Sequence, residues 1–414
     1  MIPSAVVNIT INGRQIHARA GQTVLEAAAE AGIDIPALCH HPALPPAGAC
    51  RVCLVEIQDQ RTLQPACTFP IFDGMVVQTE TERVVAARVF ALQMIFSERS
   101  HYCMFCPASG SDNNTDCELQ KLAYRYGLTC WEHVPAYQKN WPVDASGKYF
   151  VMDHSRCILC RRCVRACAEI SANHTLGVHQ RGARTMIGAD DDQPLGQSTC
   201  VSCGTCLQVC PTGALMDRRS SFLGHETDVQ RIKTTCLGCS VGCAIECLTR
   251  DNILLRIEGD WTGHNGGLLC SAGRFDAVDA KPPRIRVPLV RTDGELRPAS
   301  WGEALERTAH CLRETRNVAG LISPRTINEG LVAFSCFFNE VLNSDEVALL
   351  HGEVPPEVGE PASIADINDA DCLVVVGGDL LKNQKVVGYL TKRAFDRGAQ
   401  LVIVNDARTD LDAY

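Results

Sequence analysis

The residues with the clearest chemistry in this sequence are eight cysteines in two runs of identical spacing. Each run reads C-x2-C-x2-C-x3-C, and a proline directly follows the second. In proteins that bind two [4Fe–4S] clusters, the first three thiolates of each run bind one cluster and the fourth binds the other. The spacing therefore predicts two ligand sets, which are Cys157, Cys160 and Cys163 with Cys210, and Cys167 with Cys200, Cys203 and Cys206.

A second group of cysteines lies near the N-terminus, at Cys39, Cys50, Cys53 and Cys67. A zinc site would need two close pairs, and only Cys50 and Cys53 form one. Two alternating strands precede the group and flank Asn12-Gly13, which is typical of a type I′ hairpin. A helical pattern follows and ends at Gly32. We therefore predict a [2Fe–2S] site in a small domain of strands and one helix.

Three cysteines and a histidine form the next group, at His101, Cys103, Cys106 and Cys117. The segment RVVAARVFALQMIFSE before it is predicted to be a helix. A lone histidine is more often structural than a ligand, but three cysteines that lack a fourth favour the ligand role. An imidazole in place of a thiolate would make a [4Fe–4S] site less negative and so tune its potential.

The last group is Cys236-x2-Cys239-x3-Cys243, followed after 26 residues by Cys270. With this set, 19 of the 24 cysteines and His101 account for one [2Fe–2S] and four [4Fe–4S] clusters. Of the remaining cysteines, Cys336 and Cys372 lie in apolar runs and are predicted to be core residues. Cys247 lies close in sequence to Cys243, whose site already has four ligands. The other two are Cys130 and Cys311.

Composition limits the alternatives. The chain has 414 residues, which predicts several domains, and 24 cysteines at repeated short spacings, which favours metal binding in a reducing compartment over a disulfide scaffold. A formal net charge of −9 argues against nucleic acid as a partner. The N-terminus lacks the pattern of a signal peptide, and no apolar run has the length of a membrane span. We expect a cytoplasmic protein without direct membrane insertion.

The elements that must position these groups predict an α+β multidomain chain. The C-terminal part contains apolar runs at 372–376 and 401–404 around an amphipathic helix, which predicts a βαβ unit with a parallel sheet. Arg161, Arg162 and Arg165 follow the first cysteines of the double motif and are expected to be solvent-exposed. The predicted domains are 1–80, 81–127, 128–222, 229–285 and 286–414.

Domain by domain, these motifs resemble the large iron–sulfur subunit of respiratory complex I. Residues 1–80 look like its β-grasp [2Fe–2S] ferredoxin domain, in which ten residues separate the first two cysteines. Residues 81–127, which contain Cys117-Glu118-Leu119-Gln120, look like its domain with one histidine and three cysteines. His101 lies two residues before Cys103, a spacing associated with the electron-transfer subunit of NAD-reducing hydrogenases. The N-terminal part of NAD-dependent formate dehydrogenase alpha subunits shares this module.

The fourth group resembles the [4Fe–4S] domain of molybdopterin oxidoreductases, because its C-terminal motif matches at Asn265, Gly267, Cys270, Gly273, Arg274 and Phe275. Ala272 replaces the lysine that usually lies between cluster and pterin. Leu350 stands before His351-Gly352 where formate dehydrogenases place the molybdenum ligand, and Gly377-Gly378-Asp379 replaces a usual nucleotide contact. The chain also stops at Tyr414. We therefore predict a truncated α/β domain without molybdopterin.

These observations predict an electron-transfer subunit of a soluble multi-subunit NAD(P)-linked oxidoreductase. The resemblance implies a flavoprotein partner with FMN and an NAD(P) site, a small thioredoxin-like [2Fe–2S] subunit, and a catalytic subunit of hydrogenase or formate dehydrogenase type. No dinucleotide fingerprint or P-loop is present in the sequence, so no flavin is expected in this chain. The alternative is a catalytic alpha chain of a molybdenum or tungsten formate dehydrogenase. A zinc-binding scaffold is a third possibility.

Overall fold

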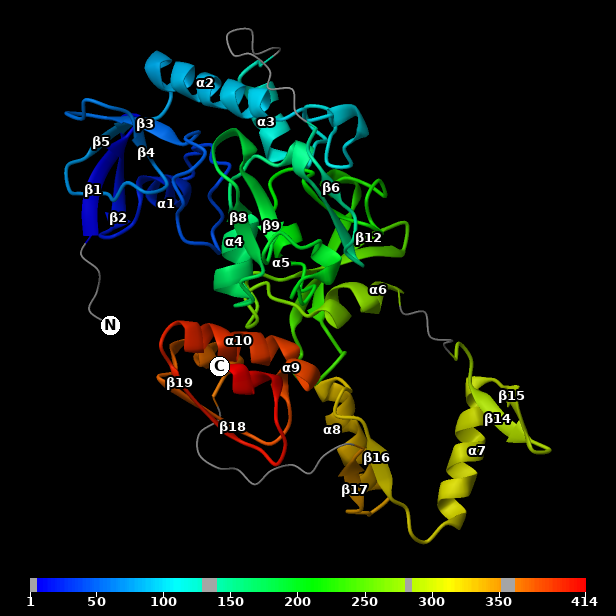
Figure 1. Cartoon of the computed structure of the whole chain (residues 1–414). Helices are drawn as coiled ribbons and strands as arrows, with labels where there is room; N and C mark the ends of the chain where they lie inside the picture. Colours follow the sequence, from blue (N-terminus) through cyan, green and yellow to red (C-terminus); the bar gives the residue numbers. More distant parts are fainter. Residues whose placement is uncertain (1–5, 129–139, 280–284, 351–361) are drawn as a thin grey trace.

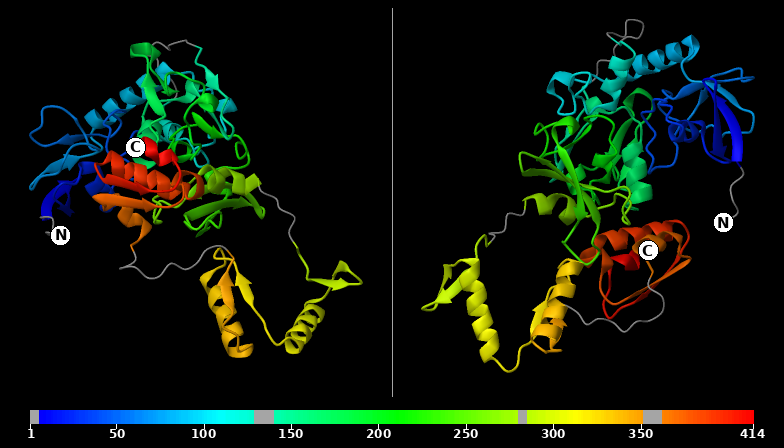
Figure 2. Two further views of the ribbon diagram at one scale, coloured as in Figure 1. Left: turned by 60° about the horizontal axis from the view of Figure 1, so that its bottom comes forward. Right: turned by 180° about the vertical axis from the view of Figure 1, so that it is seen from behind.

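The computed structural model describes residues 6–128, 140–279, 285–350 and 362–414. Its N-terminal sheet, a long helix with a cysteine loop, and a central ferredoxin-like part lie against one another (Figure 1). The last βαβ unit lies against the central part through its helix, while the stretch before it stands apart (Figure 2). Among the described residues, no helix is long and apolar enough to cross a membrane.

The N-terminal part is a five-stranded sheet that carries one helix. Its strands run in the order β2-β1-β5-β3-β4, with β1 and β5 parallel. The predicted hairpin is confirmed, because Asn12 and Gly13 connect β1 and β2 with φ of 53° and 80°. The elements are β1 (Val6–Ile11), β2 (Arg14–Arg19), α1 (Val24–Glu30), β3 (Leu54–Ile57), β4 (Gln64–Pro65) and β5 (Val76–Gln78).

The predicted helix after this sheet is α2 (Glu82–Glu98), and a short 3₁₀ turn, η1 (Cys103–Phe105), and α3 (Glu118–Arg125) follow it. Leu92 and Phe96 of α2 pack against Leu119 of α3 in a buried group that also contains Leu38 and Val52 of the first domain. Two predicted cluster domains therefore share one hydrophobic core.

The central part contains the double cysteine motif, with each run leading into a short helix. The connection between the runs contains a hairpin of β8 and β9. The elements are β6 (Val143–Asp144), β7 (Phe150–Asp153), η2 (His154–Arg156), α4 (Arg162–Arg165), η3 (Ala166–Ile170), β8 (Leu176–His179), η4 (Gly182–Arg184), β9 (Met186–Ala189), η5 (Leu195–Gln197), α5 (Thr205–Gln208) and β10 (Leu215–Asp217).

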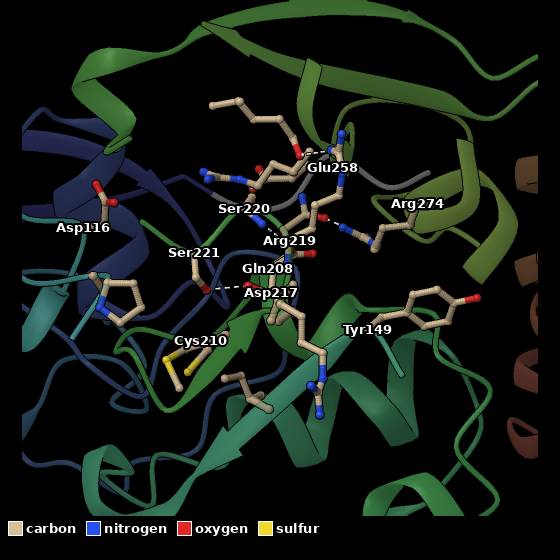
Figure 3. Close-up of a pocket in the computed structure, with 18 of the residues that line it drawn as sticks. Asp116, Tyr149, Gln208, Cys210, Asp217, Arg219, Ser220, Ser221, Glu258 and Arg274 are labelled. Atoms are coloured by element: carbon tan, nitrogen blue, oxygen red, sulfur yellow. Dashed lines mark hydrogen bonds and ion pairs between the residues drawn. The ribbon is translucent and has the colours of Figure 1, made fainter. Parts of the chain in front are cut away.

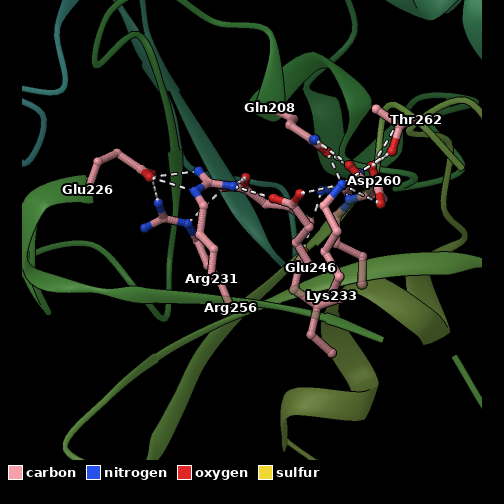
Figure 4. Close-up of polar contacts among 12 residues, drawn as sticks. Gln208, Glu226, Arg231, Lys233, Glu246, Arg256, Asp260 and Thr262 are labelled. Carbon is pink, nitrogen blue, oxygen red and sulfur yellow. Dashed lines mark hydrogen bonds and ion pairs between the residues drawn. The ribbon is translucent and has the colours of Figure 1, made fainter. Parts of the chain in front are cut away.

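An antiparallel three-stranded sheet follows, after η6 (Glu226–Asp228), with strands β11 (Gln230–Thr235), β12 (Ala244–Arg250) and β13 (Ile253–Gly259). Arg231 on β11 pairs with Glu246 and Glu258 on the next two strands and with Glu226, so charged side chains tie the three strands together (Figure 4). A π-helical turn, η7 (Ala272–Asp276), and α6 (Ala277–Asp279) come next.

Residues 285–350 form two small units that bury little surface (Figure 2). The first contains β14 (Leu289–Thr292), β15 (Glu295–Pro298) and α7 (Trp301–Glu314), and the second β16 (Gly320–Ile322), α8 (Asn328–Cys336), η8 (Phe337–Val341) and β17 (Val347–Leu349).

The predicted βαβ unit at the C-terminus is confirmed: β18 (Cys372–Val376) and β19 (Gln400–Val404) are parallel and connect through α10 (Lys385–Asp396). The short elements η9 (Ile364–Asp369), α9 (Leu380–Asn383) and η10 (Asp410–Ala413) accompany it. The prediction that Cys336 and Cys372 are core residues is wrong, since both are exposed. In the two-stranded sheet, side chains alternate between exposed and partly covered.

Candidate iron–sulfur sites

The double cysteine motif surrounds two internal spaces, each lined by one of the predicted ligand sets. Each is a small cavity with a volume of about 20 Å³. The first is lined by four cysteines together with apolar side chains such as Met152 and Ile187, and the second is similar, with Phe150 and Leu176. The first set is Cys157, Cys160, Cys163 and Cys210, and the second is Cys167, Cys200, Cys203 and Cys206.

The backbone around the two sets repeats the same geometry. Leu159 and Ser202, each two residues after the first cysteine of a run, have positive φ of 52° and 54°. Arg161 and Gly204, each four residues after the first cysteine of a run, also have backbone conformations in the left-handed region. This curvature directs the backbone N–H of Leu159 and Ser202 at the sulfur of Cys157 and Cys200. Such N–H groups stabilise a thiolate.

Burial makes these thiols hard to ionise on their own. It raises the pKa of Cys157 to about 11 and that of Cys160 to about 12, with contributions from neighbouring thiols. Burial likewise raises the pKa of Cys163 and Cys206 well above the ordinary value. Ligation by a metal deprotonates a thiol outright and offsets this cost. The buried thiols therefore fit a cationic group bound among them.

In the N-terminal domain the structure brings Cys39, Cys50, Cys53 and Cys67 together. Mutual hydrogen bonds lower the pKa of Cys39 and raise that of Cys67, as expected when several thiols share few protons. Cys39, Cys53 and Cys67 are buried and Cys50 is half-buried. Three thiols that precede β3 and one that follows β4 thus converge next to the sheet, which fits the predicted [2Fe–2S] site.

In the second domain Cys103, Cys106 and Cys117 form a group. Burial is the largest cause that raises the pKa of Cys117 to about 12, and the nearby thiols of Cys106 and Cys103 also raise it. Burial lowers the pKa of His101 to about 4, so its ring is neutral at pH 7. His101 Nε2 is buried and has no hydrogen-bond partner among the residues that the structure describes. A buried nitrogen without a partner is costly, and it is the atom through which a neutral imidazole can ligate a metal. Cys103 is exposed, so this site reaches the surface.

The fourth group also comes together. The pKa of Cys243 is raised to about 12. Burial is the largest cause, and the nearby thiols of Cys236, Cys270 and Cys239 also raise it. The Gly273 N–H donates to Cys270 Sγ over 3.4 Å. Cys247 lies on β12 beside this set, as its raised pKa from burial and from Cys236 indicates.

As the side chains stand, no three histidine, cysteine, aspartate or glutamate residues in the described parts of the chain are placed to hold a metal ion. The ligand sets are therefore proposed from how the structure groups and buries these residues. Of the remaining cysteines, Cys311 is exposed on α7, and Cys130 lies outside the described residues.

Arginines connect the proposed sites. Arg156 is buried and Arg165 is half-buried. Arg156, next to Cys157, donates to the carbonyl of Phe105, next to Cys106, over 3.0 Å. Arg165 donates to the Cys39 carbonyl over 2.5 Å. Each of these bonds joins a residue beside one site to the backbone of another.

Arg162 makes several such contacts. Its guanidinium pairs with both carboxylate oxygens of Glu118, at 2.6 and 2.7 Å, and reaches the carbonyls of Ala37 and Val209 at 3.3 and 3.5 Å. Arg162 is 4 % exposed, so the expectation of a solvated side chain is wrong for this residue, whereas Arg161 is exposed. The sequence places Arg162 between two cysteines, but its partners are distant in sequence, which is why sequence reasoning missed it.

A surface pocket lies where the second, third and fourth domains meet (Figure 3). Cys210 lines it together with Asp116, Glu258 and Arg274, so one proposed ligand of the central part faces this pocket. Arg218 and Arg219 in its wall donate to backbone carbonyls of neighbouring segments. Charged groups of both signs are balanced here, which does not favour a strongly anionic or cationic ligand.

Helix α10 of the βαβ unit covers the central part. Tyr389 and Leu390, 2 % and 0 % exposed, belong to the same hydrophobic group as Cys203, Cys243 and Leu44. Burial is the largest cause that raises the pKa of Tyr389, and Cys203 and Cys270 also raise it. The ring of Tyr389 therefore lies near the ligand set of Cys203 and that of Cys270. His174 pairs with Asp396 of α10 over 2.7 Å. This unit therefore closes one side of the proposed sites.

Two predictions concern the molybdenum region. Leu350, at the position of the expected metal ligand, is 51 % exposed, and His351-Gly352 lie outside the described residues. In Gly377-Gly378-Asp379, both glycines have positive φ and Asp379 accepts from the N–H of Leu381 at the start of α9. Asp379 is thus used as a helix cap.

Five family models match successive parts of the chain. They are a 2Fe-2S iron-sulfur cluster binding domain at 4–82, the NADH-ubiquinone oxidoreductase-G iron-sulfur binding region at 88–130, the ferredoxin-like domain of NADH-quinone oxidoreductase subunit 3 at 147–216, the molybdopterin oxidoreductase Fe4S4 domain at 229–277 and molybdopterin oxidoreductase at 284–414. Both kinds of iron–sulfur domain are therefore present, with a partial molybdopterin-type domain.

Curated relatives match nearly the whole chain. It is 32% identical to a G-type subunit of the NADH-quinone oxidoreductase of Rhizobium meliloti over 99% of its length, and 31% identical to the NADPH-Fe(3+) oxidoreductase subunit alpha of Geobacter sulfurreducens over 96%. It is also 31% identical to NADH-quinone oxidoreductase subunit 3 of Thermus thermophilus over 90%. The chain spans 49%, 48% and 51% of these three relatives, which is about half their length.

Among solved structures, a chain of the NAD+-reducing [NiFe]-hydrogenase in its H2-reduced state is 36% identical, with a TM-score of 0.48, over 53% of this chain and 90% of that one. The succession of domain models and the curated matches along nearly the whole chain agree on one assignment. The chain belongs to the family of the large iron–sulfur subunit of NADH-quinone oxidoreductase, the NADH-ubiquinone oxidoreductase-G family.

Proposed function

We propose that this chain is the iron–sulfur electron-transfer subunit of a multi-subunit NAD(P)-linked oxidoreductase. It would relay single electrons between a flavoprotein that oxidises or reduces NAD(P)H and a catalytic partner. The observation that carries this proposal is the grouping of thiols into several buried sets in adjoining domains, with arginine bridges from one set to the next. The names of the relatives, which include NADH- and NADPH-linked oxidoreductases, support it.

The proposed cofactors are one [2Fe–2S] and four [4Fe–4S] clusters, which when bound supply one-electron transfer. The chain's own residues hold them, exclude water and fix their spacing. The proposed ligand sets are Cys39, Cys50, Cys53 and Cys67 for the [2Fe–2S] cluster, and, for the [4Fe–4S] clusters, His101, Cys103, Cys106 and Cys117; Cys157, Cys160, Cys163 and Cys210; Cys167, Cys200, Cys203 and Cys206; and Cys236, Cys239, Cys243 and Cys270.

The proposed partners are an FMN-containing flavoprotein subunit with an NAD(P) site, a small thioredoxin-like [2Fe–2S] subunit, and a catalytic subunit of hydrogenase or formate dehydrogenase type, all in the cytoplasm. Because iron–sulfur clusters carry one electron at a time, hydride exchange with NAD(P)H belongs to the flavin of the partner. The proposed entry and exit sites are those near the surface, such as the site of Cys103, which is exposed.

The test is to purify the native complex, identify its subunits, and separate this chain from them. The reconstituted chain alone is expected to be reduced by dithionite and to show no reduction by NADH or NADPH. Adding back the flavoprotein subunit is expected to restore reduction by the nucleotide. Nucleotide-dependent reduction of the isolated chain would refute this division of roles.

A second candidate is a catalytic alpha chain of a molybdenum or tungsten formate dehydrogenase, which the match of 284–414 to molybdopterin oxidoreductase favours. It predicts a stoichiometric amount of molybdenum or tungsten in the native protein and formate-dependent dye reduction. Metal analysis of the native complex, followed by analysis of this separated chain, distinguishes the two functions. The electron-transfer function predicts neither metal in this chain.

A further inference from the structure

Arg274 is a buried cation with neutral hydrogen-bond partners. It is 3 % exposed, and its guanidinium donates to the carbonyls of Cys203, Ile257 and Gly267 and to Gln208 Oε1. The bonds to Cys203 and Gln208 are 2.7 and 2.9 Å long. Among the residues that the structure describes, no carboxylate forms an ion pair with Arg274. By contrast, the buried Arg162 pairs with the carboxylate of Glu118.

A buried charge of this kind is costly. Transferring a guanidinium out of water costs several kcal/mol unless an opposite charge compensates it, and arginine stays charged at every accessible pH. Burial lowers the pKa of Arg274, while Cys203, Glu258, Cys206 and Asp217 act in the opposite direction. Glu258 already pairs with Arg231 and Arg256, and Asp217 accepts hydrogen bonds from the backbone N–H groups of Arg219 and Ser220. Arg274 Nε donates directly to the Cys203 carbonyl, so the site that contains Cys203 and Cys206 is the one beside the guanidinium.

The position of Arg274 connects two of the proposed sites. It follows the proposed ligand Cys270 by four residues, and it bonds to the backbone of Cys203 in the other site. The next residue, Phe275, stacks on Tyr149 of the central part with ring centroids 4.5 Å apart. A Cβ at Gly204 would lie 2.3 Å from Arg274 Cδ, so the side chain packs directly on the loop that carries Cys203. Figure 3 shows Arg274 directed toward Gln208 in this region.

We propose that Arg274 is the counter-charge of the site formed by Cys167, Cys200, Cys203 and Cys206, and the positioning residue that ties the Cys270 site to it. This inference rests on the proposed function, because it assumes that both sites hold [4Fe–4S] clusters. A fixed cation beside a cluster favours the more negative, reduced state and so raises its reduction potential. The carboxylate of Glu258, which acts on the pKa of Arg274, carries the opposite charge and has the opposite effect on a cluster.

The experiment is a redox titration of the full reconstituted chain, followed by EPR. The signal of the Cys203 site is identified by its loss in Cys203→Ala. Arg274→Gln is expected to lower the reduction potential of this signal so that its electron equilibrium with the other sites changes about tenfold, which is 59 mV for a one-electron step. Arg274→Lys is expected to restore most of the wild-type reduction potential. Glu258→Gln is expected to shift the reduction potential upward. Arg250→Gln, which removes an exposed arginine on β12, is the matched control and is expected to leave the reduction potential unchanged.

If Arg274 had only a structural role, Arg274→Gln and Glu258→Gln would not shift the reduction potential in opposite directions. If Arg274→Gln binds its clusters and their potential does not change, the inference is overturned. If Arg274→Gln loses iron, Arg274→Lys decides: a bound cluster with a potential close to that of the wild type supports the inference, and loss of the cluster or a changed potential overturns it. If the wild-type chain itself shows no cluster signal, the proposed function fails, and that result differs from a wild-type signal that the variants leave unchanged.

Discussion

Arg162 lies beside proposed ligands of three different sites. It contacts Glu118, next to Cys117, and reaches the carbonyls of Ala37 and Val209, which are near Cys39 and Cys210. Because Glu118 is 41% exposed, part of its charge remains solvated, and the pair is a half-buried rather than a fully buried ion pair. Single side chains of this type determine how the cluster domains fit together.

Arg162→Ala is therefore expected to destabilise the folded chain by about 2 kcal/mol, because it leaves buried carbonyls and a carboxylate without their donor. Arg161→Ala, the exposed neighbour, is the matched control and is expected to change stability by less than about 0.5 kcal/mol. Thermal unfolding of the cluster-loaded chain, followed by visible circular dichroism, measures both. Equal melting temperatures for the two variants would contradict the role of Arg162.

His101 allows a second test at the residue scale. His101→Ala is expected to lose one [4Fe–4S] cluster, about 4 iron atoms per chain, because an alanine cannot ligate iron. His101→Cys is expected to retain the cluster and lower its potential, since a thiolate adds negative charge. His17→Ala, which removes an exposed histidine, is the control. Full iron content in His101→Ala would show that this histidine is structural.

At the scale of elements, the local signals in the sequence were sufficient for much of the fold. The hairpin at Asn12-Gly13 depends on the φ values of two residues, and the helix at 82–98 on a continuous pattern, so both could be predicted. The spacing of the double cysteine motif likewise predicted which thiols line each of its two cavities. Exposure could not be predicted in the same way: Cys372 lies in an apolar strand, but its two-stranded sheet is covered on one face only.

The arginine bridges could not be predicted from sequence for a related reason. Arg165 and Cys39 are 126 residues apart, and Arg274 and Cys203 are 71 apart, so no local pattern relates them. An arginine beside a cysteine is equally compatible with a solvated side chain. Only the packing of the domains shows which arginines are buried and which carbonyls they reach.

Helix α10 provides a test at the same scale. Leu390→Ala is expected to weaken the packing of α10 on the central part by about 2–5 kcal/mol, because the leucine is fully buried there. Hydrogen exchange of α10 and of the 200–206 loop is then expected to increase together. Val374→Ala, at a site 61 % exposed on β18, is the control and is expected to leave exchange unchanged. Faster exchange of α10 alone would show that it does not cover the loop.

At the scale of the whole molecule, the domains share their cores rather than following one another as separate units. One buried group combines Leu38, Leu92 and Leu119, and another combines Leu44, Cys203 and Leu390. Side chains from the N-terminal domain thus contribute to the packing around the later sites. We expect the cluster sites to form cooperatively, since each contributes to a core that another needs.

This cooperativity is tested by Cys160→Ala, which removes one proposed ligand. It is expected to lose the cluster of its own set and to weaken the neighbouring set of Cys203, with which it shares the central part. Iron content and EPR spectra of the two [4Fe–4S] signals measure this. A loss confined to one cluster, with the second signal unchanged, would show that the sites are independent.

The thiols and the imidazole of this chain are proposed to hold iron at five successive sites, and every other role assigned to the chain depends on this. Iron and sulfide analysis of the anaerobically reconstituted full chain, combined with Mössbauer spectroscopy, tests it most directly. We predict about 18 iron atoms per chain, of which about 2 belong to a [2Fe–2S] cluster and the rest to [4Fe–4S] clusters. A colourless protein that binds zinc at these cysteines, or one that retains iron at the double motif alone, would contradict this prediction.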